Sequence, residues 1–391
     1  MEKVRLGIIG LGNIGSAHAH CIASGNIKGL ELTAVCDINP QRLIVAQKIA
    51  PNAALYTSYD DLLESGLVDA VLIAVPHYLH PPVAIAAFRK GLHVLTEKPA
   101  GVYTLQVEEM NEAARQSGKV FEIMFNQRTN PLYRKTRELV QGGRIGETKR
   151  LVYIITNWYR TQAYHNSGGW RGTWSGEGGG VLINQAPHNL DLWQWIFGMP
   201  MRLRAFCYTG KYHNIEVEDE AAIYAEYKNG ATATFLTSTG ECPGTNRLEI
   251  VGDRGKIVLE NGKLRFWELA QSEREFCFED TTGSAIPEYT YQEFEPEEHD
   301  PAHAGILQNF TNAVLYGEEL IAPGYDGINE LTLSNAAYLS SWTDSWVDLP
   351  LNGELFRSEL LKRVDNIVTK QELSHDNFLK GEYSTRWSVR W

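Results

Sequence analysis

Hydrophobic residues in the first third of the chain fall in short runs that alternate with helical patterns. The apolar runs are residues 4–9, 32–36, 69–75, 93–96 and 120–125. The helical patterns run to about residue 24 and then cover 82–90 and 105–116. Short strands that alternate with helices are typical of a parallel sheet with helices on both faces. The pattern therefore predicts an α/β unit with a doubly wound parallel sheet over residues 1–125.

The pattern changes after residue 125. A helix is predicted over 131–141, and β-rich stretches follow it at 148–158, 202–208, 221–227, 231–239, 247–251, 256–259 and 264–267. Asn229-Gly230 and Asn261-Gly262 separate neighbouring stretches, and Asn-Gly is a strong hairpin signal. We therefore expect an α+β second domain, residues 126–391, with an open and mainly antiparallel sheet.

The last part of the chain is predicted to be mostly helical. Helices are expected near 303–316 and 327–345, and the acidic segment 269–300 that precedes them is expected to be an excursion or a loop. The tail, residues 353–391, has a helical period over 354–367. We expect its aromatic end to dock on another surface.

The charge balance and the cysteines exclude several classes of protein. The chain has 36 basic and 48 acidic residues and a net charge of −12, which argues against a nucleic-acid-binding protein. No apolar run reaches the roughly 18 residues that a membrane helix needs, and the N-terminus lacks the pattern of a signal peptide. The five cysteines are scattered and form no CxxC pair. They are typical of reduced thiols in a cytoplasmic protein, and we expect no metal site.

A glycine-rich turn directly follows the first strand. Its sequence is Gly10-Leu11-Gly12-Asn13-Ile14-Gly15, and a helix follows it. In such a turn Gly10 permits the tight bend, Gly12 lets the backbone approach a pyrophosphate and Gly15 lets the helix pack on the strand. The pyrophosphate then meets the free N–H groups at the start of the helix. The sequence predicts a dinucleotide-binding site here.

The residue that ends the second strand bears on the choice of dinucleotide. Asp37 can accept hydrogen bonds from both ribose hydroxyls, and it would repel the 2′-phosphate of NADP. Arg42 lies close enough in sequence to pair with such a phosphate, so NADP stays open as the less favoured cofactor. NAD is the expected cofactor.

A lysine follows the fourth predicted strand. Ligands of doubly wound sheets bind beyond the carboxyl ends of the strands, so the glycine turn, Asp37, Pro76-His77 and Glu97-Lys98-Pro99 should surround one crevice. There Lys98 could hydrogen-bond a reacting hydroxyl and stabilise a developing alkoxide. An arbitrary lysine is more often a surface residue, but its place in the fold favours the crevice.

A second cluster of candidate residues lies in the second domain. Gly178–Gly180 would allow close backbone approach to another group, and a helix is predicted from about Pro187 to Phe197. Asn184 and His188 are four residues apart and could share one helical face, with Asp191 three residues further on. Because histidine titrates near neutrality, this is a credible proton-transfer site. The alternative is that Asp191 caps a structural His188.

An aromatic and cationic segment lies between the first strand of the second domain and the triple glycine. Its residues are Trp158, Tyr159, Arg160, Tyr164, His165, Trp170, Arg171 and Trp174. Aromatic faces complement the C–H faces of a pyranose, and arginine donates to hydroxyl groups. We therefore expect Arg160, Tyr164 and Trp174 to contact a sugar, although about half of the tryptophans could instead belong to the core. Asn184 and Asp191 of the second cluster are expected to contact the substrate as well.

These motifs together resemble the Gfo/Idh/MocA family (glucose–fructose oxidoreductase, inositol dehydrogenase, rhizopine catabolism). The resemblance rests on Gly10–Gly15, Pro76–His80, Glu97–Pro99, Gly178–Asp191 and Gly324–Gly327. It implies an NAD(P)-dependent oxidation or reduction of a sugar or cyclitol at a secondary alcohol, with Lys98 and His188 catalytic. It also implies a homo-oligomer, a dimer or tetramer joined through the open sheet. Further cofactor contacts are expected from Pro76, His77, His80, Glu97 and Gln127.

One position departs from the family pattern. The family often has an aspartate where this chain has Asn184, and an amide cannot accept a proton. The base role then falls on His188, Asn184 can only orient the substrate, and a glycoside becomes a better expectation than a cyclitol. A cyclitol dehydrogenase and a redox-dependent glycosidase, which would return the hydride and accumulate no NADH, stay open. A non-catalytic NAD-binding regulator is the alternative from another class.

Overall fold

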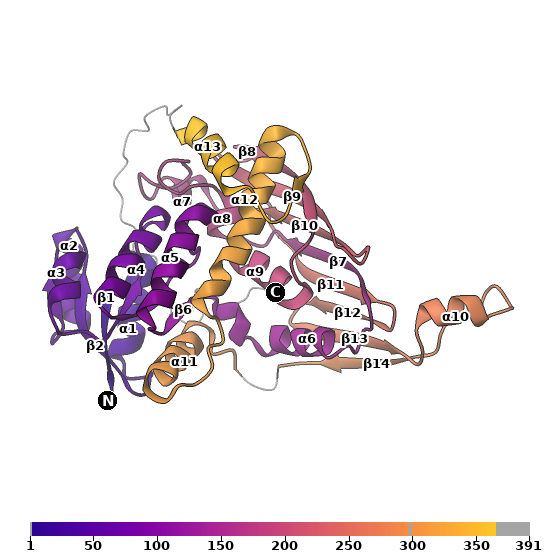
Figure 1. The fold of residues 1–391 in the computed structure, drawn as a ribbon, viewed down its shortest axis with the longest axis horizontal. Coiled ribbons are helices and arrows are strands. Elements are labelled where there is room, and N and C mark those ends of the chain that lie inside the picture. The colour runs from indigo at the N-terminus through magenta and orange to yellow at the C-terminus, as the bar shows by residue number, and fades with distance from the viewer. Residues whose placement is uncertain (1, 297–298, 365–391) are drawn as a thin grey trace.

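The structure is a computed structural model that describes residues 2–296 and 299–364 of the chain (Figure 1). The expected docking of the aromatic end, Trp387 and Trp391, lies outside the described residues. Within the described ranges, no helix has both the length and the apolar character that crossing a membrane requires.

The first sheet is wholly parallel. Its strands are β1 (Val4–Ile9), β2 (Leu30–Cys36), β3 (Ala54–Tyr56), β4 (Ala70–Ile73), β5 (His93–Thr96) and β6 (Phe121–Ile123). They are ordered β3-β2-β1-β4-β5-β6. The order reverses between β1 and β4, and ligands of doubly wound sheets bind beside such a reversal. The predicted parallel sheet is therefore confirmed.

Helices connect these strands. They are α1 (Asn13–Ala23), α2 (Pro40–Ile49), α3 (Tyr59–Glu64), α4 (His80–Arg89) and α5 (Thr104–Ser117). The sequence analysis assigned no element to residues 38–68, which form α2, β3 and α3. The reason is weak patterning, because α2 buries only Leu43 and Ala46 and β3 is a three-residue strand at the sheet edge.

The second sheet is open and mainly antiparallel, as predicted. Its strands are β7 (Thr148–Ile155), β8 (Arg202–Thr209), β9 (Glu218–Glu226), β10 (Thr232–Ser238), β11 (Asn246–Gly252), β12 (Gly255–Glu260), β13 (Lys263–Leu269), β14 (Tyr289–Phe294) and β15 (Val347–Asp348). They are ordered β14-β13-β12-β11-β7-β10-β9-β8-β15. Only β7 and β10 pair in parallel among the described strands of this sheet.

Helices cover one face of this second sheet and lie between the two sheets (Figure 1). They are α6 (Pro131–Gln141), α9 (Pro187–Phe197) and α12 (Gly327–Thr343). Trp193 of α9 stacks on Phe235 of β10, with ring centroids 5.8 Å apart. Because side chains alternate along a strand, the next residue, Leu236, points to the opposite face, where Phe206 and Tyr224 are also exposed.

The segment predicted to be an excursion or a loop, residues 269–300, contains a helix and a strand. Helix α10 (Glu273–Glu279) projects from the edge of the sheet (Figure 1), and β14 pairs with β13. The projection agrees with an excursion, whereas the helix and the strand were not predicted, because neither element carries a burial pattern. No residue of α10 is buried, and Phe278 is 92% exposed.

The chain returns to the first sheet after residue 300. Helix α11 (Ala302–Tyr316) and the short turn Gly324–Asp326 precede α12, and helix α13 (Gly353–Val364) follows it. The backbone N–H of Ile123 donates to the oxygen of Ala322 at 3.0 Å, beside the edge strand β6. A Cβ on Gly324 would lie 2.4 Å from the Phe121 ring, so glycine is required for this approach. The contact brings the start of α12 to the crevice edge.

Candidate active site

The glycine turn at the start of α1 has the shape that a dinucleotide requires. Gly10 has φ +95°, and a Cβ there would lie 2.4 Å from the oxygen of Ala74. A Cβ on Gly15 would lie 1.9 Å from the oxygen of Gly10. A Cβ on Gly12 would meet nothing within 4 Å, and Gly12 caps α1 without a side-chain hydrogen bond. The turn with Asn13 and Ile14 therefore fits a pyrophosphate at the helix N-terminus.

Asp37 lies beside this turn at the end of β2. Its Oδ2 accepts the N–H of Leu11 at 2.7 Å, and its Oδ1 accepts the N–H of Asn39 at 2.8 Å. Arg42 Nη1 lies 3.5 Å from Oδ2 of Asp37. The arginine that could have paired with the 2′-phosphate of NADP therefore pairs with the Asp37 carboxylate instead. The structure thus brings Asp37 and the glycine turn together at one end of the crevice.

The two crevice histidines are held by backbone oxygens. His77 Nδ1 lies 2.8 Å from the oxygen of Glu177, which joins the segment after β4 and Pro76 to the second sheet's domain. His80 lies between the oxygen of Pro99, 2.7 Å from Nδ1, and that of Val75, 2.8 Å from Nε2. Burial lowers the pKa of both imidazoles. These contacts fix the walls of the crevice around Lys98.

Lys98 connects the first sheet to the second cluster. Its Nζ donates to the backbone oxygen of Asn184 at 2.7 Å. The side-chain amide of Asn184 donates in turn to the carboxylate of Glu177. Burial lowers the pKa of Lys98, and the nearby carboxylate of Glu97 opposes that shift. Lys98 and Asn184, which were both expected at the reaction site, are therefore in contact.

Two buried residues, Glu97 and His18, lie next to Lys98 and hold its backbone in place. Glu97 Oε1 lies 2.7 Å from His18 Nε2, and both side chains are buried. Glu97 Oε2 accepts the N–H of Lys98 at 3.2 Å. Sequence analysis expected Glu97 to contact the cofactor, whereas here its carboxylate is engaged by His18 and the backbone. His18 had no predicted role, since nothing local links it to Glu97.

His188 is the second residue of α9, and its ring is buried. Its Nδ1 has no hydrogen-bond partner among the described residues. Burial, and then the positive charge of Lys98, hold the pKa of His188 well below its ordinary value. The ring is therefore neutral at neutral pH and has a nitrogen that can accept a proton.

Asp191 and Trp174, two predicted substrate residues, belong to the protein interior. Both Asp191 oxygens are held by Arg128, with Nε–Oδ2 at 2.8 Å and Nη2–Oδ1 at 2.6 Å. Arg128 also donates to Asp326 at 2.7 Å. Trp174 packs edge to face on Tyr338 and on Trp342, each with ring centroids 5.3 Å apart. Both side chains are buried, and these contacts account for them.

Arg160 and Tyr164 lie near Lys98. The hydroxyl of Tyr164 accepts a hydrogen bond from Arg171 Nη1 at 2.7 Å and from Gln185 Nε2 at 3.1 Å. The guanidinium groups of Arg160 and Arg171 lie over the Tyr164 ring, 4.9 and 4.5 Å from its centroid. Their positive charges also lower the pKa of Lys98, after burial.

Gln127 is buried just beyond β6. Its side-chain oxygen has no hydrogen-bond partner in the part of the chain that the structure describes. Because buried amide oxygens are nearly always hydrogen-bonded, this one is available to a bound group. The geometry fits the expected cofactor contact.

The triple glycine packs against the protein itself. A Cβ on Gly178 would lie 2.3 Å from Val102, one on Gly179 2.2 Å from the Tyr338 hydroxyl, and one on Gly180 1.8 Å from the oxygen of Glu218. The expected close approach is therefore to neighbouring elements, which hold helix α8 (Val181–Asn184) in place.

Two glutamates near this turn were missed by the sequence analysis. Glu218 accepts the N–H groups of Gly180 and Leu182, each at 2.9 Å, and burial raises its pKa to about 7. Glu177 accepts the N–H of Gly172 at 2.6 Å, and burial raises its pKa. No local pattern marks either residue, because the partners of Glu218 come from a segment about 36 residues away.

In the described part of the chain, no group of three or more histidine, cysteine, aspartate or glutamate residues is arranged to hold a metal ion.

Comparison with known proteins agrees with this architecture. Residues 4–125 match the family model described as an oxidoreductase family with an NAD-binding Rossmann fold, and residues 133–258 match the GFO/IDH/MocA C-terminal domain. Among relatives, the myo-inositol 2-dehydrogenase of Thermotoga maritima is 27% identical over 343 residues, which cover 85% of this chain and 95% of that protein. The inositol 2-dehydrogenase of Rhizobium meliloti is 24% identical over 86% of this chain and 96% of its own.

Solved structures are similar over nearly the whole chain. The WlbA dehydrogenase from Bordetella pertussis, in complex with NADH and UDP-GlcNAcA, has a TM-score of 0.75 and 26% identity, over 90% of this chain and all of that chain. A levoglucosan dehydrogenase, in complex with NADH and levoglucosan, has a TM-score of 0.72 at 21% identity, over 89% of this chain and all of its own, and shows a shared fold. The chain belongs to the GFO/IDH/MocA family and is an NAD-binding oxidoreductase of that family.

Proposed function

We propose that the protein is an NAD-dependent dehydrogenase that acts on a secondary alcohol of a sugar or glycoside, with Lys98 and His188 as catalytic residues. The observation that carries the proposal is the hydrogen bond from Lys98 Nζ to the Asn184 backbone at 2.7 Å, beside a neutral, buried His188. A cation and a neutral imidazole at the carboxyl end of a dinucleotide-binding sheet suit the oxidation of an alcohol.

Each residue has a distinct task in this proposal. The glycine turn and Asp37 would hold NAD, which would supply the acceptor for the hydride on the carbon that carries the hydroxyl group. Lys98 donates a hydrogen bond to the hydroxyl oxygen in exchange for its contact with Asn184, and its charge stabilises the developing alkoxide. A ring nitrogen of His188 accepts the hydroxyl proton. Asn184, Arg160 and Tyr164 orient the ring.

The nature of the substrate follows from the donors around Lys98. Arg160, Arg171 and the Tyr164 hydroxyl bring several polar groups together near Lys98, as a polyhydroxylated ring requires. A cyclitol is the second candidate, because the relative from Thermotoga maritima is a myo-inositol 2-dehydrogenase. Asn184 favours a sugar, since an amide cannot take part in a proton relay.

An assay of NADH absorbance with NAD and a panel of pyranoses, glycosides and inositols tests the proposal. Turnover of a sugar or glycoside above that of every inositol supports it. Release of an aglycone without accumulation of NADH would replace it with a redox-dependent glycosidase. Tight NADH binding with no turnover across the panel would contradict it in favour of a non-catalytic regulator.

We also propose that the open face of the second sheet joins copies of the chain. Phe206 on β8 pairs with Ala222 on β9, and Leu236 on β10 pairs with the same residue, so the three side chains form an apolar row across the strands. Phe206 and Leu236 are both exposed. Light scattering should detect a dimer or tetramer that Phe206→Lys with Leu236→Lys converts to a monomer. A monomeric wild-type protein would contradict the proposal.

A further inference from the structure

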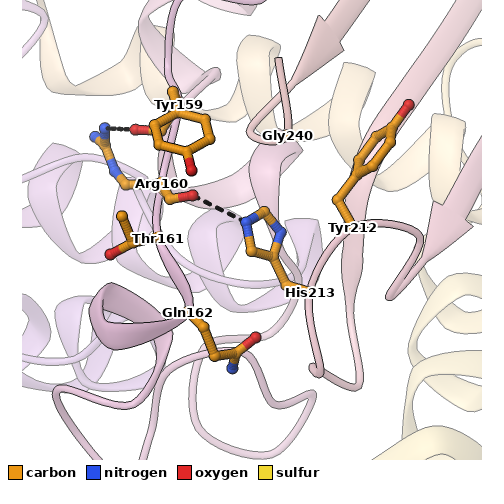
Figure 2. Close-up of a pocket in the computed structure, with 7 residues that line it drawn as sticks. All are labelled: Tyr159, Arg160, Thr161, Gln162, Tyr212, His213 and Gly240. Atoms are coloured by element: carbon orange, nitrogen blue, oxygen red, sulfur yellow. Dashed lines mark hydrogen bonds between the residues drawn. The ribbon is translucent and has the colours of Figure 1, made fainter. Parts of the chain in front are cut away.

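A hollow of about 330 Å³ lies between two connections of the second domain, beside Arg160 (Figure 2). Residues 159–162 form one wall, on the connection from β7 to helix α7 (Gln162–His165). Tyr212 and His213, from the connection between β8 and β9, form the other wall, and Gly240 closes the back. Its volume is at the lower end of the range for small-molecule sites, about 300–1,000 Å³, and suits one small ring.

Two tyrosine rings line opposite sides of the hollow (Figure 2). Tyr159 is 47% exposed and Tyr212 is 49% exposed. The Tyr212 ring is held in place, because its hydroxyl donates to Glu220 at 2.6 Å and its face packs on Gly240. A Cβ on Gly240 would lie 2.3 Å from that ring, so the approach requires glycine. The hollow therefore presents the exposed Tyr159 ring together with a Tyr212 ring whose position is fixed before any ligand binds.

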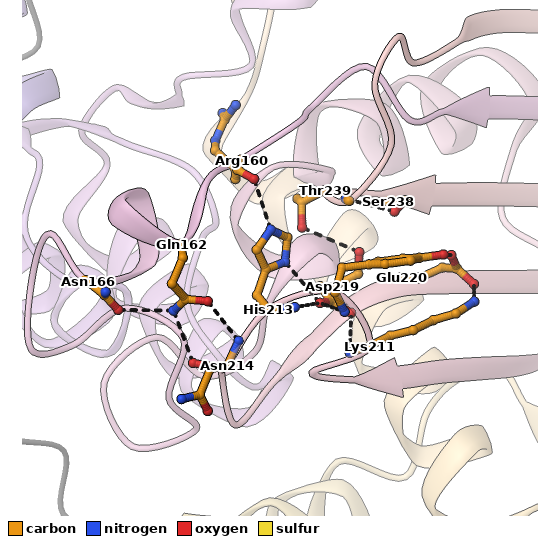
Figure 3. Close-up of polar contacts among 12 residues, drawn as sticks. Arg160, Gln162, Asn166, Lys211, His213, Asn214, Asp219, Glu220, Ser238 and Thr239 are labelled. Carbon is orange, nitrogen blue, oxygen red and sulfur yellow. Dashed lines mark hydrogen bonds and ion pairs between the residues drawn. The ribbon is translucent and has the colours of Figure 1, made fainter.

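Buried polar contacts make the wall of the hollow rigid (Figure 3). His213 lies between Asp219 and the chain at Arg160, with Nδ1–Oδ2 at 3.0 Å and Nε2 2.9 Å from the Arg160 oxygen. Asp219, which is buried, also accepts the N–H groups of Tyr212 and His213 at 2.8 and 2.9 Å. Gln162 accepts the N–H of Asn214 at 2.8 Å. The two connections are thus fastened to each other.

Arg160 links the hollow to the proposed reaction site. Its backbone lines the hollow, whereas its guanidinium points away from His213 and Tyr212 (Figure 2). The guanidinium packs over Tyr164, whose hydroxyl is bonded to Gln185, the residue after Asn184. These contacts join the hollow to the turn at Asn184, whose backbone oxygen accepts the hydrogen bond from Lys98.

We propose that this hollow is an outer subsite that binds a second, uncharged sugar ring. The inference rests on the proposed function and names its substrate class: a glycoside or oligosaccharide, of which one ring reacts beside Lys98 and the next stacks on Tyr159 and Tyr212. Aromatic faces complement the C–H faces of such a ring. A diphosphate is disfavoured, because the Arg160 guanidinium faces away and both His213 nitrogens are engaged.

Matched substrate pairs test the inference. We would measure kcat/KM by NADH absorbance for methyl glucoside and methyl galactoside against cellobiose, maltose and lactose, with UDP-glucose as a charged probe. The variants are Tyr159→Ala and Tyr212→Ala, and the matched control is Tyr316→Ala, an exposed tyrosine at the end of α11. Calorimetric titration of each variant with the preferred disaccharide in the presence of NADH gives a second readout.

The expected result is a preference for a disaccharide over its methyl glycoside by about tenfold, equivalent to about 1.4 kcal/mol. Either tyrosine variant removes that preference and leaves kcat/KM for the methyl glycoside unchanged. The control variant, Tyr316→Ala, changes neither the preference nor the methyl glycoside kcat/KM. Three outcomes overturn the inference while the dehydrogenase proposal stands. They are a preference that survives both variants, equal rates for both members of each substrate pair, and a preference for UDP-glucose. If no sugar is turned over, the proposed function fails. The titration then decides whether the hollow binds a disaccharide through the tyrosines, and absence of binding overturns the inference as well.

Discussion

The Nζ atom of Lys98 lies 2.7 Å from the backbone oxygen of Asn184, which is 86 residues away in the sequence. This hydrogen bond connects the end of β5 to the turn that carries His188. A buried ammonium group needs an acceptor, and here the acceptor is a neutral carbonyl that a substrate hydroxyl can replace. The contact therefore holds Lys98 in position without neutralising its charge.

Replacing Lys98 with methionine should abolish most of the activity and spare the fold. Methionine keeps the length of the side chain and removes the charge, so we expect kcat to fall by about 10²- to 10³-fold. Stopped-flow and steady-state NADH measurements on the preferred sugar would show it. Lys90→Met, at an exposed ion pair with Glu64, is the matched control and should keep wild-type rates. A Lys98→Met enzyme with unchanged kcat would remove Lys98 from the mechanism.

Alanine substitutions should have different effects in the glycine turn, Gly10–Gly15, and in the triple glycine, Gly178–Gly180. Gly12→Ala should leave the free energy of unfolding within about 0.5 kcal/mol, because its Cβ meets nothing within 4 Å. It should weaken NADH binding, because that Cβ points where the pyrophosphate must approach the backbone. Gly180→Ala should instead cost about 3 kcal/mol of stability, because its Cβ would lie 1.8 Å from the Glu218 oxygen.

Chemical unfolding and fluorescence titration with NADH check this pair of variants. Loss of stability in Gly12→Ala, or a fully stable Gly180→Ala, would contradict the assignment of the first motif to the cofactor and of the second to packing.

Breaking the buried ion pair between Arg128 and Asp191 should be strongly destabilising. Arg128→Leu leaves Asp191 without its guanidinium, and we expect a loss of about 3–5 kcal/mol in the free energy of unfolding. Replacing both residues with leucine should cost less than the two single changes together, because no buried charge is left uncompensated. Urea unfolding of the two single leucine variants and of the double variant measures the coupling energy between Arg128 and Asp191. Strict additivity would mean that the pair does not stabilise α9, the helix that carries His188.

Contacts between neighbouring segments could be predicted from the sequence, whereas contacts between distant segments could not. The place of Asp37 beside the glycine turn could be predicted because a strand, a turn and a helix follow one another locally, and the place of Lys98 because it follows a strand. The ion pair of Asp191 could not be predicted, because its partner Arg128 lies 63 residues away on another element. The packing of Trp174 on Tyr338 could not be predicted either, because composition alone does not distinguish an exposed ring from a packed one.

A buried histidine without a partner should make stability depend on pH. His165 is buried, neither of its ring nitrogens has a hydrogen-bond partner among the described residues, and burial lowers its pKa to about 4. The folded state therefore keeps His165 neutral at pH 5, whereas the unfolded state protonates it below about pH 6.5. Stability from this residue is complete above pH 6.5 and is lost as the pH falls towards 4.

His165→Phe removes that titration and keeps an aromatic ring beside Tyr164, 5.2 Å away between centroids in the wild type. We expect the variant to equal or exceed the wild type in stability at pH 7, because an unsatisfied buried polar group is removed. Its advantage should grow by about 1–2 kcal/mol between pH 7 and pH 5. Guanidinium unfolding at both pH values measures this change, with Ile215→Val, a substitution of a buried neighbour across Gly172, as the control that does not titrate. Equal pH dependence in His165→Phe and the wild type would mean that this imidazole is protonated in the folded protein, and hence that it has an acceptor.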